Sequence, residues 1–202
     1  MTEPIRYLDD VDELLRELPP EKKEYAKKKI ERDLLTNTYN KEAFESRLEK
    51  AILKAQSGRD KNQLIVLMMD LDGFGDHNKT VGHLTANKTL VEIIDEIRKV
   101  LRPIETDNLG RFGGDEFTFY FFGPGIDAGY SVAERARKAV AEKFEKKHSI
   151  TLSVGVAAYQ PVKEDTRTLK ERGEAVLQEA NKAMLLVKQE GKNGVEPYNP
   201  KN

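Results

Sequence analysis

Four carboxylates stand where strand-like segments of the chain end or begin. Asp70 and Asp72 follow the apolar run of residues 64–69, which indicates a buried central strand. Because alternate residues of a strand face the same side, these two carboxylates would share one face at its end. Asp115 and Glu116 precede a second strand-prone run. Magnesium binds through one or two carboxylates together with substrate phosphates, so the set indicates phosphoryl or nucleotidyl transfer.

Gly113 and Gly114 predict a tight hairpin turn within residues 108–122. Glycine has no Cβ, so a phosphate can come close to the backbone there, which makes both glycines candidate nucleotide-binding residues. Asp115 and Glu116 would stand at the mouth of the turn and face opposite sides of the strand. A lone turn of this composition is usually an ordinary surface hairpin. The acidic pair at the end of the other strand favours a functional site.

Length and composition limit the kind of protein this can be. The chain has 202 residues, of which 34% are charged, a formal net charge of −1 and no cysteine. Disulfides and thiol catalysis are therefore excluded, and the near-neutral charge argues against a general nucleic-acid binder. The longest apolar run is far shorter than a bilayer span, and the first residues lack a signal-peptide pattern. We expect one soluble, cytoplasmic domain with appendages and no nucleic-acid or membrane partner.

The order of the expected elements is typical of an α+β domain. Strands interleaved with helices and one central hairpin predict a mixed, mostly antiparallel central sheet flanked by helices, a palm-like (ferredoxin-like) arrangement. After an N-terminal helical segment, apolar periodicity predicts a helix at 41–55, a strand at 64–69, a helix at 86–101, a hairpin at 108–122, a helix at 132–144, a strand at 150–159, a helix at 169–187 and a short last strand.

Four blocks of this sequence resemble the GGDEF domain, the diguanylate cyclase family, and they occur in the family's order. The resemblance runs from about Asp33 to about Gly194, and four ordered blocks are far more specific than one short motif. It implies a fold like the palm of polymerases and class III nucleotide cyclases. It also implies a homodimeric enzyme that condenses two GTP into cyclic di-GMP and releases pyrophosphate. The blocks are DLDGFGDHNKTVGH, RFGGDEF, ITLSVGVA and EANKAMLLVKQEGKNG.

The resemblance assigns metal and catalytic roles. The carboxylates of Asp70 and Asp115 and the carbonyl of Leu71 would hold two Mg²⁺ ions per active site. These ions would bridge the triphosphate and lower the pKa of the attacking 3′-hydroxyl. Asp115 and Glu116 would jointly supply metal ligation and a general base, and the sequence does not divide these tasks between them.

The resemblance also assigns nucleotide contacts. Asn78 stands where the family hydrogen-bonds guanine, and Lys188 and Lys192 stand where it binds the phosphates. The two lysines are four residues apart near the end of the last helix, so we expect them on one face. A lysine pair at a helix C-terminus is often only a surface feature that complements the helix dipole. The matching blocks favour phosphate binding.

Three departures from the family pattern bear on activity and base choice. Gly75 replaces a phosphate-binding lysine, and Lys79 stands where the family has an aspartate. Asn87 replaces an aspartate that accepts protons from the guanine edge. An asparagine amide offers one acceptor group and one donor group, so it can in principle pair with adenine. Preference for guanine would therefore be weakened without being abolished.

Two alternatives to a GTP-specific cyclase stay open. The first is a catalytically weak GGDEF domain that acts as a nucleotide-binding regulatory module, which Gly75 and Lys79 favour and the complete signature opposes. The second is a cyclase of altered base choice that uses ATP, alone or with GTP, which Asn87 favours. Feedback inhibition is expected to be lost, because Ile104 stands where the family's upstream product-binding motif has an arginine, although Asp107 is present.

Residues 1–32 would form an N-terminal helical extension ahead of the domain at 33–198. Helical spacing predicts one helix over 5–18, which two prolines end, and a lysine-rich helix over 21–34. The extension could be a cap on the domain or a short dimerising or signal-transmitting helix. We favour the second interpretation because two catalytic halves must be brought together.

Overall fold

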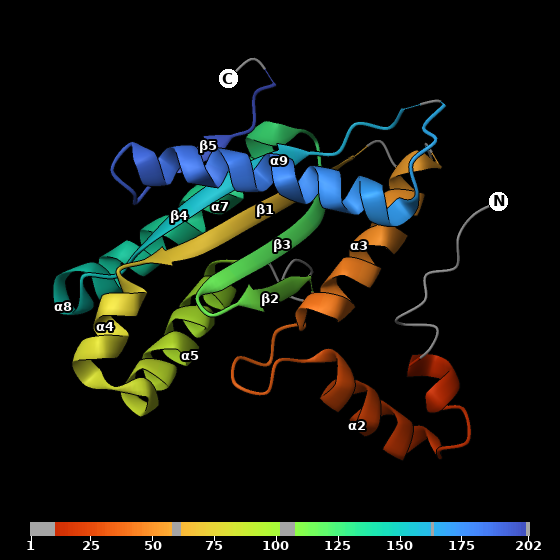
Figure 1. Cartoon of the computed structure of the whole chain (residues 1–202), viewed down its shortest axis with the longest axis horizontal. Coiled ribbons are helices and arrows are strands. Elements are labelled where there is room, and N and C mark those ends of the chain that lie inside the picture. The colour runs from red at the N-terminus through yellow and green to blue at the C-terminus, as the bar shows by residue number, and fades with distance from the viewer. Residues whose placement is uncertain (1–10, 58–61, 102–107, 163, 201–202) are drawn as a thin grey trace.

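The computed structural model describes residues 11–57, 62–101, 108–162 and 164–200. Its strands form one five-stranded sheet in the order β2-β3-β1-β4-β5 (Figure 1). The central strand β1 pairs antiparallel with β3 and β4, and β5 runs parallel to β4. The expected α+β class with a mixed, mostly antiparallel sheet is therefore confirmed. The strands are β1 (Gln63–Asp72), β2 (Leu109–Gly113), β3 (Glu116–Gly123), β4 (Thr151–Ala158) and β5 (Val195–Pro197).

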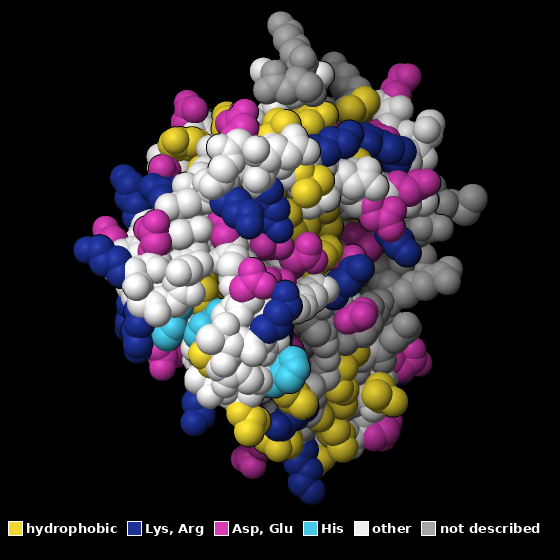
Figure 2. All heavy atoms as spheres, turned by 60° about the vertical axis from the view of Figure 1, so that its left-hand side comes forward, with side chains coloured by type: hydrophobic (Ala, Val, Ile, Leu, Met, Phe, Trp, Pro, Cys, Tyr) yellow, Lys and Arg dark blue, Asp and Glu magenta, His cyan; other side chains and the backbone are white. Residues whose placement is uncertain are grey.

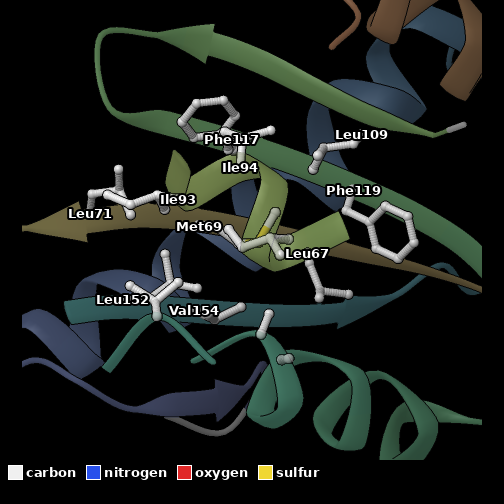
Figure 3. Close-up of a cluster of buried hydrophobic side chains, with 14 of the residues drawn as sticks. Leu67, Met69, Leu71, Ile93, Ile94, Leu109, Phe117, Phe119, Leu152 and Val154 are labelled. Atoms are coloured by element: carbon white, nitrogen blue, oxygen red, sulfur yellow. The ribbon is translucent and has the colours of Figure 1, made fainter. Parts of the chain in front are cut away.

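Helices cover both faces of the sheet, and alternate residues of β1 point into two separate cores. One core joins the odd-numbered residues of β1 to α5 (His83–Val100) and α7 (Ile126–Val140), and Figure 3 shows part of it. The other joins the even-numbered residues to α3 (Lys41–Gln56) and α9 (Leu169–Gln189). Burial on both faces explains why β1 is a continuous apolar run rather than an alternating one.

The long helix α9 has a defined start and a defined end. At its start the Thr168 hydroxyl accepts a hydrogen bond from the Glu171 amide at 3.2 Å, and the Glu171 carboxylate accepts one from the Thr168 amide at 2.7 Å. Such a reciprocal cap stabilises a helix by about 1 kcal/mol. After α9 ends at Gln189, Gly191 takes a positive φ of 117°, as expected of a glycine that ends a helix.

Within the described residues, helix α4 (Phe74–Val81) was not predicted from the sequence, and several boundaries are shifted. Helix α4 is only two turns long and lies between Gly73 and Gly82, which have φ values of 77° and 79°. Helix α5 starts three residues earlier than expected. The helix expected at 132–144 starts at Ile126 as α7 and continues through a π-helical turn, η1 (Ala141–Glu145), into α8 (Lys146–His148).

The second helix of the N-terminal extension, α2 (Pro20–Glu31), is joined to α3 by an ion pair. The buried carboxylate of Glu31 accepts from the Arg47 guanidinium at 2.8 Å. Helix α2 ends three residues before the expected Leu34, because Arg32 is extended and bridges to Tyr39. The first six residues of the helix expected at 5–18 lie outside the described residues, and the domain boundary at 32/33 stays a prediction. Within the described ranges, no helix is long and apolar enough to cross a membrane.

Candidate active site

A hollow of about 230 Å³ opens at the end of β1, between the β2-β3 turn and the C-terminal end of α9. The face turned toward the viewer in Figure 2 carries acidic and basic side chains gathered near its centre. The hollow brings together five of the residues that the sequence singled out for metal or phosphate binding. Its lining residues are Asp70, Leu71, Asp72, Gly73, Gly75, Asp76, Asp115, Lys188 and Lys192.

A larger hollow of about 980 Å³ lies at the opposite end of the sheet and has a different chemical character. Among the described residues that line it, none is acidic. A cation therefore has no carboxylate ligand there, and the smaller hollow is the better candidate for metal-assisted chemistry. The cationic side chains that line the larger hollow are Lys27, Arg47, Lys50, Lys54 and Arg135.

Asp70 is a buried carboxylate of the site that forms an ion pair. It is 7% exposed, and the Lys188 ammonium lies 2.7 Å from its Oδ2 atom. Strand register places Asp70 directly opposite Glu116 of β3, so their side chains share a face of the sheet. Burial raises the pKa of Asp70, Lys188 opposes that shift, and the charges of Asp115 and Glu116 add to it. The Lys188 ammonium thus compensates the negative charge of the buried Asp70 carboxylate.

The donor set fits a magnesium ion that takes its remaining ligands from a nucleotide. Among the residues described, no three His, Asp or Glu side chains converge closely enough to hold a metal ion by themselves. Magnesium needs only one or two carboxylates when waters and phosphates complete its shell. Asp70 and Asp115 line the same hollow, and the Leu71 amide donates to the Asp115 carbonyl at 3.3 Å. The Leu71 side chain packs in the core (Figure 3), so its backbone carbonyl is the group it can offer as a ligand.

Asp115 and Glu116 line two different hollows. Asp115, in the turn, lines the hollow beside Asp70, whereas Glu116 lines a neighbouring hollow of about 270 Å³ with Glu45 and Glu174. Both carboxylates still act on Asp70 through their charge. The geometry therefore favours Asp115 over Glu116 as the second carboxylate ligand, a distinction that the sequence left open.

The turn that carries Asp115 is held in place by an arginine. The Arg111 Nε and Nη2 atoms donate to the Gly114 carbonyl at 3.0 and 2.7 Å, and Nη1 donates to the Asp33 carboxylate at 3.1 Å. Gly114 has a φ of 23° and open space where a Cβ would stand, so its backbone conformation, and not crowding, requires glycine. Neither Gly113 nor Gly114 is among the residues that line the hollow.

Asp72 anchors the turn that carries Lys192. Its carboxylate accepts from the Thr151 hydroxyl at 2.8 Å, the Ser153 hydroxyl at 2.8 Å and the Asn193 amide at 3.1 Å. Lys192 and Asn193 both have positive φ, 67° and 49°, which is strained for residues with side chains. The hydrogen bond from the Asn193 amide to the Asp72 carboxylate holds this strained turn next to the hollow.

Lys192 does not share a helix face with Lys188. Helix α9 ends at Gln189, and Lys192 follows in the next turn. The expectation that both lysines project from one face of the last helix is therefore wrong, because Gly191 reverses the chain first. The turn nevertheless brings Lys192 back to the rim, and both lysines line the hollow.

The two asparagines expected to read the base lie outside the lining of the hollow. Asn78 is on α4, and its Oδ1 atom is buried with no hydrogen-bond partner among the described residues. An unsatisfied buried acceptor is unfavourable unless a ligand supplies a donor. Asn87 is exposed on α5.

Two residues at the site were missed in the sequence, and a third, Asp72, was expected among the carboxylates of the metal site but holds the surrounding backbone. Gly73 has a φ of 77°, and a Cβ there would lie 2.4 Å from the Ser149 carbonyl oxygen, so only glycine fits. Asp76 lies on the exposed side of α4 and pairs with Lys79 at 2.8 Å. Asp72 acquires its anchoring role only through pairing with β4. The glycines that flank α4 were the available signal for that helix. Ile104 and Asp107 lie outside the described residues.

Comparisons with known proteins identify the family of this chain and agree with its fold. The family model "Diguanylate cyclase, GGDEF domain" matches residues 30–194. Diguanylate cyclase DgcP of Pseudomonas aeruginosa is 35% identical over 168 residues, which are 81% of this chain and 23% of that protein. Diguanylate cyclase A of Treponema denticola is 33% identical over 81% of this chain and 43% of that protein. The chain thus spans less than half the length of these relatives.

Solved structures of GGDEF domains share the fold of this chain. The coiled coil and GGDEF domain of DgcB from Caulobacter crescentus, in complex with c-di-GMP, has a TM-score of 0.75 and 26% identity, and the match covers 95% of this chain and 97% of that one. The GGDEF domain of TpbB from Pseudomonas aeruginosa has a TM-score of 0.68 and 28% identity, over 83% of this chain and 94% of that one.

Asp72→Asn should destabilise the protein and loosen the Lys192 turn. The amide is an uncharged acceptor and has one acceptor oxygen fewer, so we expect a loss of about 1–2 kcal/mol in the free energy of unfolding. Denaturant unfolding measures this loss, with Asp95→Asn on the exposed side of α5 as the control. A variant as stable as the wild type would show that the Asp72 contacts do not hold the turn.

Asp70→Asn should stabilise the metal-free protein at neutral pH. Because the pKa of Asp70 is raised above its ordinary value of 3.8, its stabilising contribution is fully present below that value and is lost as pH rises through the raised pKa. Removing the charge should therefore raise the thermal midpoint at pH 7, by about 2–4 °C for each 1 kcal/mol, and the gain should vanish in acid. Asp76→Asn on the rim should give no gain. A lower midpoint for Asp70→Asn would mean that its ion pair with Lys188 outweighs burial.

Proposed function

The chain belongs to the GGDEF domain family, and we propose from this that it is a nucleotidyl cyclase that condenses two GTP into cyclic di-GMP. The single observation that carries the proposal is the arrangement around Asp70. A buried carboxylate, a second carboxylate from the β2-β3 turn and two lysines line one hollow. Carboxylates for a metal ion and lysines for phosphates are the two requirements of a metal–nucleotide site.

Each side chain of the hollow has a task in this proposal. Asp70, Asp115 and the Leu71 carbonyl would hold Mg²⁺, two ions per active site, which when bound neutralise phosphate charge and make the 3′-hydroxyl more acidic. Lys188 leaves Asp70 and binds the phosphates together with Lys192. The exchange keeps the buried carboxylate compensated, because it loses its ammonium partner only when another cation replaces it.

The chemistry requires two copies of the chain. One hollow serves one nucleotide, and the product contains two, so two sites must face each other in a homodimer. The 3′-oxygen of each nucleotide then attacks the α-phosphorus of the other. Two new phosphodiester bonds form, and two pyrophosphates leave. Both nucleoside triphosphates are drawn from the cytoplasm, where we place the reaction.

Incubation with Mg²⁺ and each nucleoside triphosphate, followed by mass spectrometry of the products, tests the proposal. We expect cyclic di-GMP and pyrophosphate from GTP, and loss of both products in Asp115→Asn. Glu174→Gln, in the neighbouring hollow, is the matched control and should remain active. Nucleotide binding without any product, over a wide range of protein concentrations, would instead favour the regulatory module. Linear products, or an absence of nucleotide binding, would reject both the cyclase and the regulatory module.

Gly75→Lys should strengthen nucleotide binding. Position 75 is exposed, and nothing lies within 4 Å of a Cβ placed there, so a lysine can be accommodated at the rim of the hollow. One added charge-assisted contact to phosphate should lower the KM for GTP by about tenfold, equivalent to about 1.4 kcal/mol.

Gly75→Ala is the control for this variant. Replacing a helical glycine should stabilise α4 by about 1 kcal/mol without changing KM. If both variants lower KM equally, helix stability and not the phosphate contact limits binding. If Gly75→Lys leaves KM unchanged, the phosphates do not pass position 75.

Asn87→Asp should sharpen the preference for GTP over ATP. A carboxylate accepts from both donors of the guanine edge, whereas the amide turns its NH₂ group toward one of them. Hydrogen bonds to charged groups contribute about 1.5–3 kcal/mol against about 1 for neutral pairs, so discrimination should rise by about tenfold. Competition between GTP and ATP for the wild type and the variant measures it. A wild type that already strongly prefers GTP, and that the substitution does not change, would contradict this account of Asn87.

A further inference from the structure

Two histidines meet where α4, α5 and α8 come together beside the hollow. His77 precedes Asn78 on α4 and is 7% exposed. The His148 ring, at the end of α8, meets it edge to face with ring centroids 4.7 Å apart. Neither histidine is used by the proposed mechanism, and the sequence gave no reason to single them out. Their position suggests a link between the packing of α4 and the nucleotide site.

A hydrogen bond joins the His77 ring to α5. The His77 Nε2 atom lies 3.1 Å from the Thr89 hydroxyl oxygen, and either atom can be the donor of this contact. The Thr89 hydroxyl also lies 3.2 Å from the Thr85 carbonyl oxygen, to which it can donate. His77 thereby ties α4 to α5 through this hydrogen bond.

A second contact ties α4 to α8 close to the hollow. Gly73, the residue before α4, lies against the Ser149 carbonyl, which follows His148 directly. The His148 ring also stacks on Phe144 at 6.2 Å. The start of α4 is thus held between the Thr89 contact and the end of α8. Gly73 and Gly75 from this segment line the hollow, and Asn78 lies one turn further along α4.

We propose that His77 is a positioning residue for the nucleotide, and that protonation of His148, which packs on it, loosens α4 and weakens nucleotide binding. With His148 neutral, the pair packs edge to face and holds the α4 backbone beside the phosphates and Asn78 beside the base. A charged His148 ring is less favourable in this position, because burial disfavours the charged form. The inference rests on the proposed function only in taking the bound ligand to be a nucleotide.

The surroundings of His148 favour its neutral state near pH 7. Burial, His77 and Lys147 lower the pKa of His148 below its ordinary value of 6.5, and Glu92 of α5 opposes them. The charged residues of α4 itself, Asp76 and Lys79, pair with each other on its exposed side. The site should therefore be insensitive to pH above 6.5, and it should lose affinity as pH falls below that value.

Calorimetric binding of Mg²⁺ with a non-hydrolysable GTP analogue, from about pH 5.5 to about pH 8, tests the proposal without requiring turnover. We expect the wild type to bind about tenfold more weakly at the acid end. Because the nucleotide phosphates titrate in the same range, the readout is the difference between proteins. His148→Gln should lose most of the acid sensitivity, and His83→Gln, at the exposed start of α5, should retain it.

Substitutions at the other contacts separate positioning from folding. His77→Gln keeps a polar group near the Nε2 position but removes the ring that packs on His148, so it should weaken binding at pH 7.5 as well as in acid. Thr89→Val preserves shape, removes the hydroxyl and should weaken binding at every pH. If turnover is measurable, KM should follow these changes while kcat stays nearly constant.

The proposal fails if His148→Gln keeps the wild-type pH dependence, or if Thr89→Val binds as tightly as the wild type. Absence of cyclic product, with the histidine effects on binding intact, would reject the proposed reaction and leave the positioning role standing.

Discussion

The ion pair between Asp70 and Lys188 is the interaction around which this site is built. The central strand β1 is buried on both faces, so polar chemistry can begin only where the strand ends. At that end Asp70 is almost fully buried and has two further carboxylates nearby. A buried charge of this kind is tolerated only with a cation beside it. The last turn of α9 supplies that cation, which makes the position of α9 a requirement of the site.

Two anchors keep the walls of the hollow in place, and each uses residues that are distant in the chain. Arg111 joins Asp33 to the Gly114 carbonyl and so fixes the turn that carries Asp115. Asp72 joins β4 to the strained turn after α9 and so fixes the backbone beside Lys192. Asp70 is therefore free to change its partner from an ammonium group to a metal ion while the surrounding backbone remains fixed.

The sequence predicted the parts of the site that depend on local pattern. The apolar run of β1, the carboxylates at its end and the glycine turn are all visible in short stretches of chain, and the sheet class followed from their order. The role of Asp72 was not visible, because its partners come from β4 and from the turn after α9. The short helix α4 was missed because two turns are too few to establish an apolar period. Lys192 was expected on the same helix face as Lys188, because residue spacing alone cannot show where a helix ends.

The most direct test of this account is a carbon-13 NMR titration of the Asp70 carboxyl group, assigned with the Asp70→Asn variant. In the metal-free protein, we expect its pKa above the ordinary 3.8. Saturation with Mg²⁺ and a non-hydrolysable GTP analogue should move its resonance and abolish its titration near that pKa, because a bound cation then replaces Lys188. An Asp70 signal that titrates identically with and without magnesium and nucleotide would contradict the assignment of Asp70 as the metal carboxylate.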